Sequence, residues 1–229
     1  MVSVMGKRGL FLVWLCLVNI LPGMAQTEKL IDYVNPFVGT DGYGNVYPGA
    51  QIPFGGIQMS PDTDSKYYDA ASGYKYNHST LLGFSLTHLS GTGIPDLGDF
   101  LFISGTGEMK LDPGTREEPE KGYRSRYSHE KEWASPNYYA VELSDYGVKA
   151  EMTAGLRSGM FRFTYPKSEQ AFIMIDMNHT LWQSCEWSNL RMENDSTLTG
   201  YKLVKGWGPE RHVYFTAVFL SLIHISEPT

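Results

Sequence analysis

Several side chains in the first hundred residues have types and spacings that could do acid–base chemistry. His88 follows an apolar stretch and precedes the turn Ser90-Gly91-Thr92-Gly93, where an imidazole can donate to a hydroxyl group, exchange a proton or satisfy local backbone groups. Asp96 and Asp99 flank Leu97-Gly98 as a pair of carboxylates, and turn formation explains them equally well. These residues are therefore candidates for acid–base chemistry, but their spacing is not specific to one kind of site.

Two neighbouring segments offer ligand-binding chemistry. Asp62 and Asp64 have the hard oxygen atoms that calcium prefers, but the twelve-residue calcium-loop pattern is absent and a turn is the stronger interpretation. Tyr68 and Asp69 precede Ser72-Gly73-Tyr74; an aromatic face packs on the C–H face of a sugar and a carboxylate accepts from its hydroxyls. A surface loop with packed tyrosines is an equally good interpretation of that segment.

The elements that must position these side chains are rich in glycine and aromatic residues. A plain core strand does not need so many glycines, which suit sharp turns or a close approach of the backbone to another group. Trp182, Trp187 and Trp207 lie near later strand ends, where core or interface packing competes with a carbohydrate platform.

Both ends of the chain differ in character from the rest. Lys7 and Arg8, a short apolar run and Gly23-Met24-Ala25 predict a signal peptide over residues 1–25, cleaved near Ala25, and a secreted or periplasmic protein with no transmembrane segment afterwards. Residues 221–229 are expected to be a non-native tail, so that this chain is a fragment. The domain between them spans residues 26–220.

Charge and cysteine content exclude several classes of function. The net charge is -6, and removal of residues 1–25 takes away two basic residues and no acidic one, which leaves -8. This argues against nucleic acid as a partner. Only Cys185 would then remain, so no intrachain disulfide can form, as fits a bacterial exported protein.

Beyond residue 100, short apolar segments alternate with turn residues. Strands are expected at 100–104, 138–143, 148–153, 160–165, 171–177, 196–204 and 212–219, a long loop at 112–136, and one short helix at 28–34. Strands with turn signals about 8 to 12 residues apart indicate an all-β fold, an antiparallel β-sandwich.

The order of the early motifs resembles the N-terminal domain of glycoside hydrolase family 92. The motifs that carry the resemblance are Tyr33-Val34-Asn35-Pro36-Phe37-Val38-Gly39-Thr40, Tyr47-Pro48-Gly49-Ala50, Pro53-Phe54-Gly55, Ser60-Pro61-Asp62, Ser72-Gly73-Tyr74, Gly83-Phe84-Ser85, Thr87-His88-Leu89-Ser90-Gly91 and Asp96-Leu97-Gly98-Asp99. One such motif is weak, whereas eight in the same order indicate common descent.

The resemblance implies an exported α-mannosidase that hydrolyses terminal α-linked mannose from glycans with inversion. It implies a β-sandwich followed by an (α/α)6 barrel as intramolecular partner, with the active site at their junction and Ca2+ as cofactor. Catalytic residues and metal ligands are expected in the barrel and none is assigned here. By position, the substrate-binding candidates of this chain are Phe54, Gly55, Tyr68, Asp69, His88 and Ser90.

Two points stay open at this stage. Many family members have Trp and Cys before Ser-Gly-Tyr, where this chain has Tyr68-Asp69-Ala70-Ala71, so the preferred mannoside linkage is not fixed. The alternative function is a non-catalytic carbohydrate-binding β-sandwich module.

Overall fold

The computed structural model describes residues 29–66 and 68–220. The chain divides into two compact units, residues 1–33 and 34–229. The described part of the first unit is a short 3-10 helix, η1 (Leu30–Tyr33), within the segment where a helix was predicted. The signal peptide and the tail that the sequence predicts lie outside the described residues. Across the described ranges, no helix is long and apolar enough to cross a membrane.

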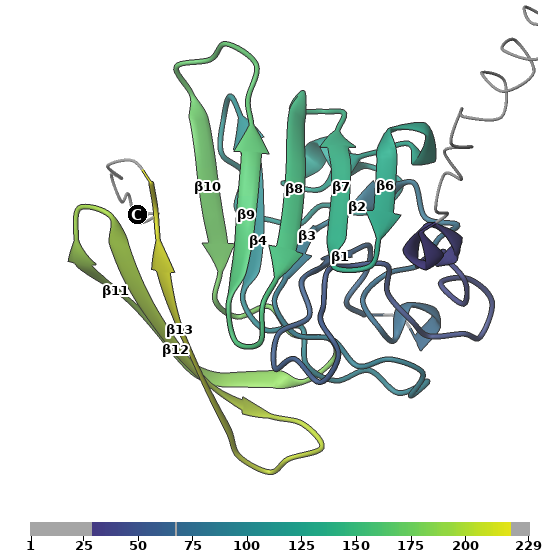
Figure 1. Cartoon of the computed structure of the whole chain (residues 1–229). Coiled ribbons are helices and arrows are strands. Elements are labelled where there is room, and N and C mark those ends of the chain that lie inside the picture. The colour runs from purple at the N-terminus through teal and green to yellow at the C-terminus, as the bar shows by residue number, and fades with distance from the viewer. Residues whose placement is uncertain (1–28, 67, 221–229) are drawn as a thin grey trace, which may run out of the picture. The chain divides into compact units, whose positions relative to one another are not determined.

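The second unit is built almost entirely from antiparallel strands, as predicted (Figure 1). One four-stranded sheet has the order β1-β3-β4-β10. Its strands are β1 (Ser60–Asp62), β3 (Gly83–Ser85), β4 (Leu101–Thr106) and β10 (Ala171–Asp176). The short β1 and β3 carry the early sequence motifs, and the regular β4–β10 ladder supports them from one side.

A second four-stranded sheet has the order β6-β7-β8-β9. Its strands are β6 (Glu132–Ser135), β7 (Tyr138–Leu143), β8 (Val148–Ala154) and β9 (Gly159–Thr164). The predicted β7–β8 hairpin is present, turning through Gly147, whose φ of 64° favours glycine. The expectation of a long loop at 112–136 is wrong in part, because β6 forms the edge of this sheet and β5 (Ser125–Arg126) pairs with β2 (Thr80–Leu81).

The two sheets face each other across a shared core, which makes the sandwich (Figure 1). Phe84 of β3 lies 6.2 Å from Phe161 of β9, measured between ring centroids. Tyr139 and Val148 of the other sheet are fully buried. Burial of each large apolar side chain contributes about 1.5–3 kcal/mol, so this shared core is the main force that holds the layers together.

A third sheet of three strands lies to one side of the sandwich in Figure 1, in the order β11-β12-β13. Its strands are β11 (Ser184–Asn194), β12 (Thr197–Lys205) and β13 (Arg211–Val218). The sequence did not predict β11, whereas β12 and β13 fall where strands were expected. One face of β12 is buried, and Phe215 of β13 packs 4.5 Å from Phe100, so this sheet is anchored on the segment that leads into β4.

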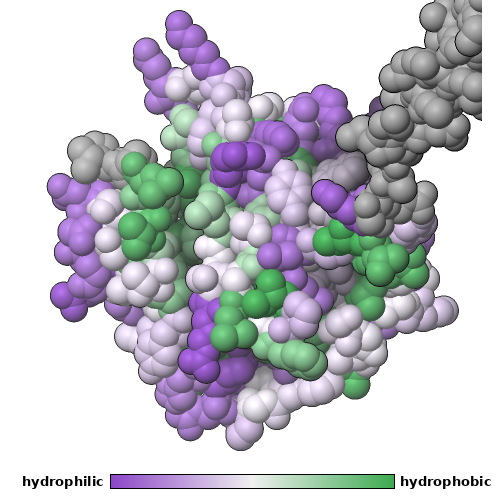
Figure 2. Space-filling view, viewed as in Figure 1, coloured by the Kyte–Doolittle hydropathy of each residue, from purple (hydrophilic) through white to green (hydrophobic). Residues whose placement is uncertain are grey.

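Three further 3-10 turns complete the described elements. They are η2 (Tyr68–Ala70), η3 (Pro119–Lys121) and η4 (His129–Lys131). On the face seen in Figure 2, hydrophobic residues gather in several separate patches divided by hydrophilic ones.

Candidate functional site

Motifs that are distant along the sequence converge on one buried polar network. Asp62 at the end of β1 accepts hydrogen bonds from two histidines, with 2.7 Å from Oδ1 to His88 Nε2 and 2.7 Å from Oδ2 to His179 Nε2. His88 Nε2 also lies 3.0 Å from Ser85 Oγ, and His88 Nδ1 lies 2.7 Å from the carbonyl of Gln58. The network therefore joins three separate segments, residues 58–62, residues 85–88 and His179, around one carboxylate.

The partners of His88 fix the orientation of its ring. Nδ1 lies 2.7 Å from the Gln58 carbonyl and Nε2 lies 2.7 Å from Asp62 Oδ1, and a carbonyl or an ionised carboxylate can only accept hydrogen bonds. Burial by itself raises the pKa of Asp62, but the positive charge of His88 and the hydrogen bonds from His179 and His88 outweigh it, and the pKa of this carboxyl lies well below its usual range. His88 and Asp62 thus form a fully buried pair.

Gly73 of the Ser72-Gly73-Tyr74 motif makes this network possible. Its φ is +84°, and a Cβ there would overlap Asp62 Oδ1 and lie 3.2 Å from His88 Cδ2. The glycine is required both by its backbone conformation and by the close approach of the two polar side chains.

A second buried network fixes the three-stranded sheet to the same place. Asp99 Oδ1 lies 3.0 Å from Lys202 Nζ, and its Oδ2 accepts hydrogen bonds from Arg211 and, at 2.7 Å, from Thr87. Lys202 Nζ also donates to the backbone carbonyl of His179 at 2.6 Å. Burial raises the pKa of Asp99, but the charges of Lys202 and Arg211 outweigh it and lower that pKa.

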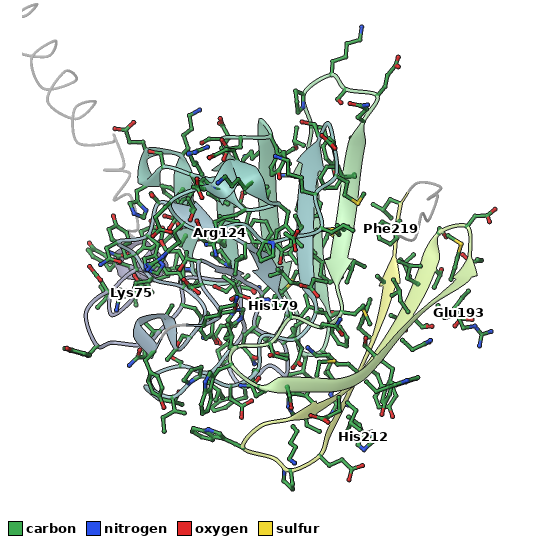
Figure 3. The ribbon with its side chains drawn as sticks, turned by 180° about the vertical axis from the view of Figure 1, so that it is seen from behind. Lys75, Arg124, His179, Glu193, His212 and Phe219 are labelled. Atoms are coloured by element: carbon green, nitrogen blue, oxygen red, sulfur yellow. The ribbon has the colours of Figure 1, made fainter. Side chains whose placement is uncertain are left out.

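The segment between β10 and β11 runs from the buried networks to the surface. His179, labelled in Figure 3, lies inside the sandwich unit, and three residues later Trp182 is 59% exposed with a φ of +78°. A positive φ is strained for a bulky residue and persists where the surrounding structure holds it. The ring of Trp182 lies 6.2 Å from that of Tyr68, and both are exposed.

A groove of about 490 Å³ begins at Trp182. Its lining residues are Pro95, Trp182, Gln183, Ser184, Glu186, Lys205, Gly206 and Trp207. The backbone N–H of Trp207 donates to Asp96 at 3.2 Å, which ties the β12–β13 loop to the wall of the groove. Exposed aromatic faces beside polar groups suit a ligand with an apolar ring face and many hydroxyls.

The structure places the six predicted binding residues at different depths. Phe54, with a φ of 61°, Tyr68 and Ser90 are exposed. His88 is only 3% exposed, so its imidazole lies behind the surface. Gln58 connects two of the predicted segments, because its side-chain amide donates to the carbonyl of Gly55 at 2.8 Å while its own backbone carbonyl accepts from His88. The side chain of Asp69 lies outside the described residues.

The described side chains do not fit a calcium site. No group of three or more His, Cys, Asp or Glu that could hold a metal ion occurs among the residues the structure describes. Asp62 is engaged by two histidines, and Asp64 lies 3.5 Å from Arg116 Nε. Both aspartates that the sequence offered as calcium ligands thus have positively charged or hydrogen-bonding partners instead.

Sequence reasoning missed the residues that connect the networks, namely His179, Lys202 and Arg211. The signal for Lys202 was available: in β12 it occupies the same alternating position as the buried Leu198 and Val204. A lysine on the buried face of a strand requires an ionised partner. The identity of that partner, Asp99, depends on the tertiary fold.

Comparison with known proteins gives consistent results. Residues 33–226 match the model of the Glycosyl hydrolase family 92 N-terminal domain. A family GH92 α-mannosidase from Bacteroides thetaiotaomicron, solved alone and with mannoimidazole, is 87% identical with a TM-score of 0.84, over 85% of this chain and 26% of that one. A family GH92 inverting mannosidase from the same species is 26% identical with a TM-score of 0.65, over 83% of this chain and 25% of that one.

A protein from Arthroderma benhamiae described as an uncharacterized secreted glycosidase is 31% identical over 145 residues, which are 62% of this chain and 18% of that protein. The chain thus spans about a quarter of the two solved mannosidases and less of the Arthroderma protein. Because the family model matches residues 33–226, this chain belongs to glycosyl hydrolase family 92 and carries its N-terminal domain.

Proposed function

We propose that this chain is the N-terminal part of an exported bacterial α-mannosidase that removes terminal α-linked mannose from glycans with inversion. The observation that supports this most is the 87% identity to an α-mannosidase over 85% of the chain, with a TM-score of 0.84. An inverting mannosidase of the same family with the same fold supports the stereochemical part of the proposal. The buried networks around Asp62 and Asp99 hold the segments that line the groove at Trp182. This explains why the early motifs occur together in the sequence.

The described carboxylates suit a structural role. An inverting glycosidase needs one carboxylic acid and one carboxylate on opposite faces of the sugar, about 6.5–9.5 Å apart. Asp62 and Asp99 are buried in ion pairs, and Asp96 accepts hydrogen bonds from the backbone N–H groups of Leu97 and Trp207. We therefore place the acid, the base and any calcium ligands in parts of the complete protein beyond the described residues.

The chain would instead supply one wall of the substrate pocket. Tyr68 and Trp182 would stack on the apolar face of a sugar ring, and His88 would hold the wall from behind through Asp62 and Gln58. Exposed Phe54 and Ser90, with Gly55 and Asp69, are the remaining candidates for contact.

A chimera tests the proposal directly. The matching segment of the Bacteroides α-mannosidase is replaced by residues 33–220 of this chain, and release of mannose from an aryl α-mannoside is measured. We expect the chimera to be active, and Tyr68→Ala in it to raise KM about tenfold because a stacking surface is lost. Proton NMR of the first product formed should show the β-anomer, as inversion requires.

The controls distinguish the loss of a sugar contact in the pocket wall from a general effect on folding. Trp133→Ala removes an aromatic side chain that is 64% exposed on β6 and should leave KM unchanged. The 229-residue chain assayed alone should release no mannose. Release of mannose by it would contradict the proposal that the catalytic acid and base lie elsewhere in the complete protein. A folded but inactive chimera would refute the assignment as a mannosidase domain.

A further inference from the structure

The outer face of the three-stranded sheet presents a cluster of aromatic residues that the proposed pocket does not use. Tyr201 of β12 lies at its centre, with ring centroids 5.1 Å from Trp187 of β11 and 4.7 Å from Tyr214 of β13. The cross-strand register pairs Asn189 with Tyr201 and Tyr201 with Tyr214, so these side chains share one face. Trp187 is 55% and Tyr214 70% exposed, which shows that this face is open in the described chain.

The opposite face of the same sheet is already occupied. Leu198, Lys202 and Val204 alternate with the outer residues of β12 and are buried. The aromatic cluster is therefore not needed to close the core on which the sheet is anchored. Large exposed aromatic side chains in this arrangement indicate a binding surface.

A groove of about 470 Å³ runs from the aromatic cluster into polar side chains. Glu193 is held there from two sides, because Thr199 Oγ1 donates to it at 2.6 Å and Arg191 Nη2 lies 3.3 Å from its other carboxylate oxygen. Thr216 and Asn189 also line the groove. The groove thus offers an acceptor, a donor and small hydroxyls beside flat apolar rings.

The aromatic end is also fixed by hydrogen bonds. The hydroxyl of Tyr201 and Nδ1 of His212 are 2.7 Å apart, and His212 Nε2 lies 2.9 Å from Glu210. Figure 3 shows Glu193 and His212 toward opposite ends of this sheet, well apart from His179. The groove beside the aromatic cluster shares no lining residue with the groove at Trp182, so the two surfaces are distinct.

We infer that this outer face of β11, β12 and β13 is a second glycan-binding surface, which takes a neutral pyranose oligosaccharide. Aromatic rings pack on the C–H faces of sugar rings, while carboxylate, guanidinium and hydroxyl groups bind the equatorial and axial hydroxyls. Glu193 and Glu210 and the net charge of -6 disfavour a polyanionic ligand. Successive rows on one face are about 7 Å apart, so three rows extend over roughly 13 Å and fit an oligosaccharide better than one sugar.

The test is binding of linear mannopentaose and of soluble yeast mannan to the 229-residue chain, by isothermal titration and by affinity electrophoresis. We expect a Kd of about 1 mM or tighter for mannopentaose and retardation by mannan. The double variant Trp187→Ala/Tyr214→Ala should bind at least about tenfold more weakly. Trp133→Ala, an equally exposed aromatic on β6, should bind as the unchanged chain does.

The outcomes separate this surface from the proposed pocket. Trp182→Ala, which alters the other groove, is the comparison, and the double variant should weaken mannopentaose binding more than Trp182→Ala does. If Trp182→Ala abolishes binding while the double variant does not, the inference is wrong and the pocket wall stands. If the unchanged chain binds neither probe, or if the double variant alters only the oligomeric state in light scattering, the face is not a glycan site. If the double variant has a lower melting temperature than the unchanged chain, the single variant Tyr214→Ala is used in its place.

Discussion

At the scale of single residues, the early glycines have different roles. Gly73 and Gly91 both have positive φ, of +84° and +76°, but their surroundings differ. A Cβ at Gly73 would meet Asp62 and His88, whereas a Cβ at Gly91 would have nothing within 4 Å. A comparison of the two glycines therefore separates the cost of a positive φ from the cost of a steric overlap with neighbouring side chains.

This difference predicts the effects of Gly73→Ala and Gly91→Ala. Gly91→Ala should lower the free energy of unfolding by about 1–2 kcal/mol, the cost of a left-handed conformation for a residue with a Cβ. Gly73→Ala should cost at least about 2 kcal/mol more, because the buried ion pair must also move. Urea unfolding at neutral pH measures both variants. Equal losses would show that the approach of Asp62 and His88 does not determine the need for glycine.

At the scale of elements, Lys202 connects β12 with the sandwich. Its side chain is fully buried, and Nζ contacts Asp99, the carbonyl of His179 and, at 5.1 Å, the ring of Phe100. Burial lowers the pKa of Lys202, and Asp99 opposes that shift. Lys202 thus adds an internal ion pair to the contacts that anchor the three-stranded sheet.

Replacing this cation should be costly. Lys202→Met keeps the apolar stem but leaves Asp99 with Arg211 as its remaining ion-pair partner, and we expect a loss of about 3–5 kcal/mol in the free energy of unfolding. Lys205→Met, at the exposed end of the same strand, is the matched control and should change stability by less than about 0.5 kcal/mol. Similar urea midpoints for the two variants would contradict the role given to Lys202.

At the scale of the whole molecule, two buried carboxylates link stability to pH. The folded-state pKa values of Asp62 and Asp99 are both lowered by cationic neighbours, despite the opposing effect of burial. A lowered pKa contributes stability that is fully present above the unfolded-state value, 3.8 for aspartate, and is lost as pH falls toward the folded-state value. Acid should therefore weaken the contacts of β1 with His88 and His179 and those of Asp99 with the three-stranded sheet.

The expected result is a steep fall in the free energy of unfolding below about pH 4, by about 2 kcal/mol or more. Asp62→Asn should be less stable than the unchanged chain at pH 7 and should show a shallower fall on acidification, since one of the two carboxylates no longer titrates. Urea unfolding from pH 7 to about pH 2.5 measures both. Parallel curves for the two proteins would show that Asp62 does not titrate with folding.

The amino-acid sequence by itself determined the fold class, the family and the strands that correspond to β4, β7 to β10, β12 and β13. Alternation of apolar residues with turn signals is a local property, and it located β7, β8, β12 and β13. It missed β11, whose side chains are mostly exposed and polar, and β6, which lies in a charged segment, because neither has a strong local pattern.

Only the tertiary structure decided how the candidate residues are used. His88 was a substrate-binding candidate beside a glycine turn, but it is buried with Asp62, Ser85 and Gln58. Two of these partners, Asp62 and Gln58, like the partners of Lys202, come from segments far away in the chain, and no local pattern specifies such pairings. The same holds for the Trp187–Tyr201–Tyr214 surface, because strand pairing alone brings side chains from three strands onto one face.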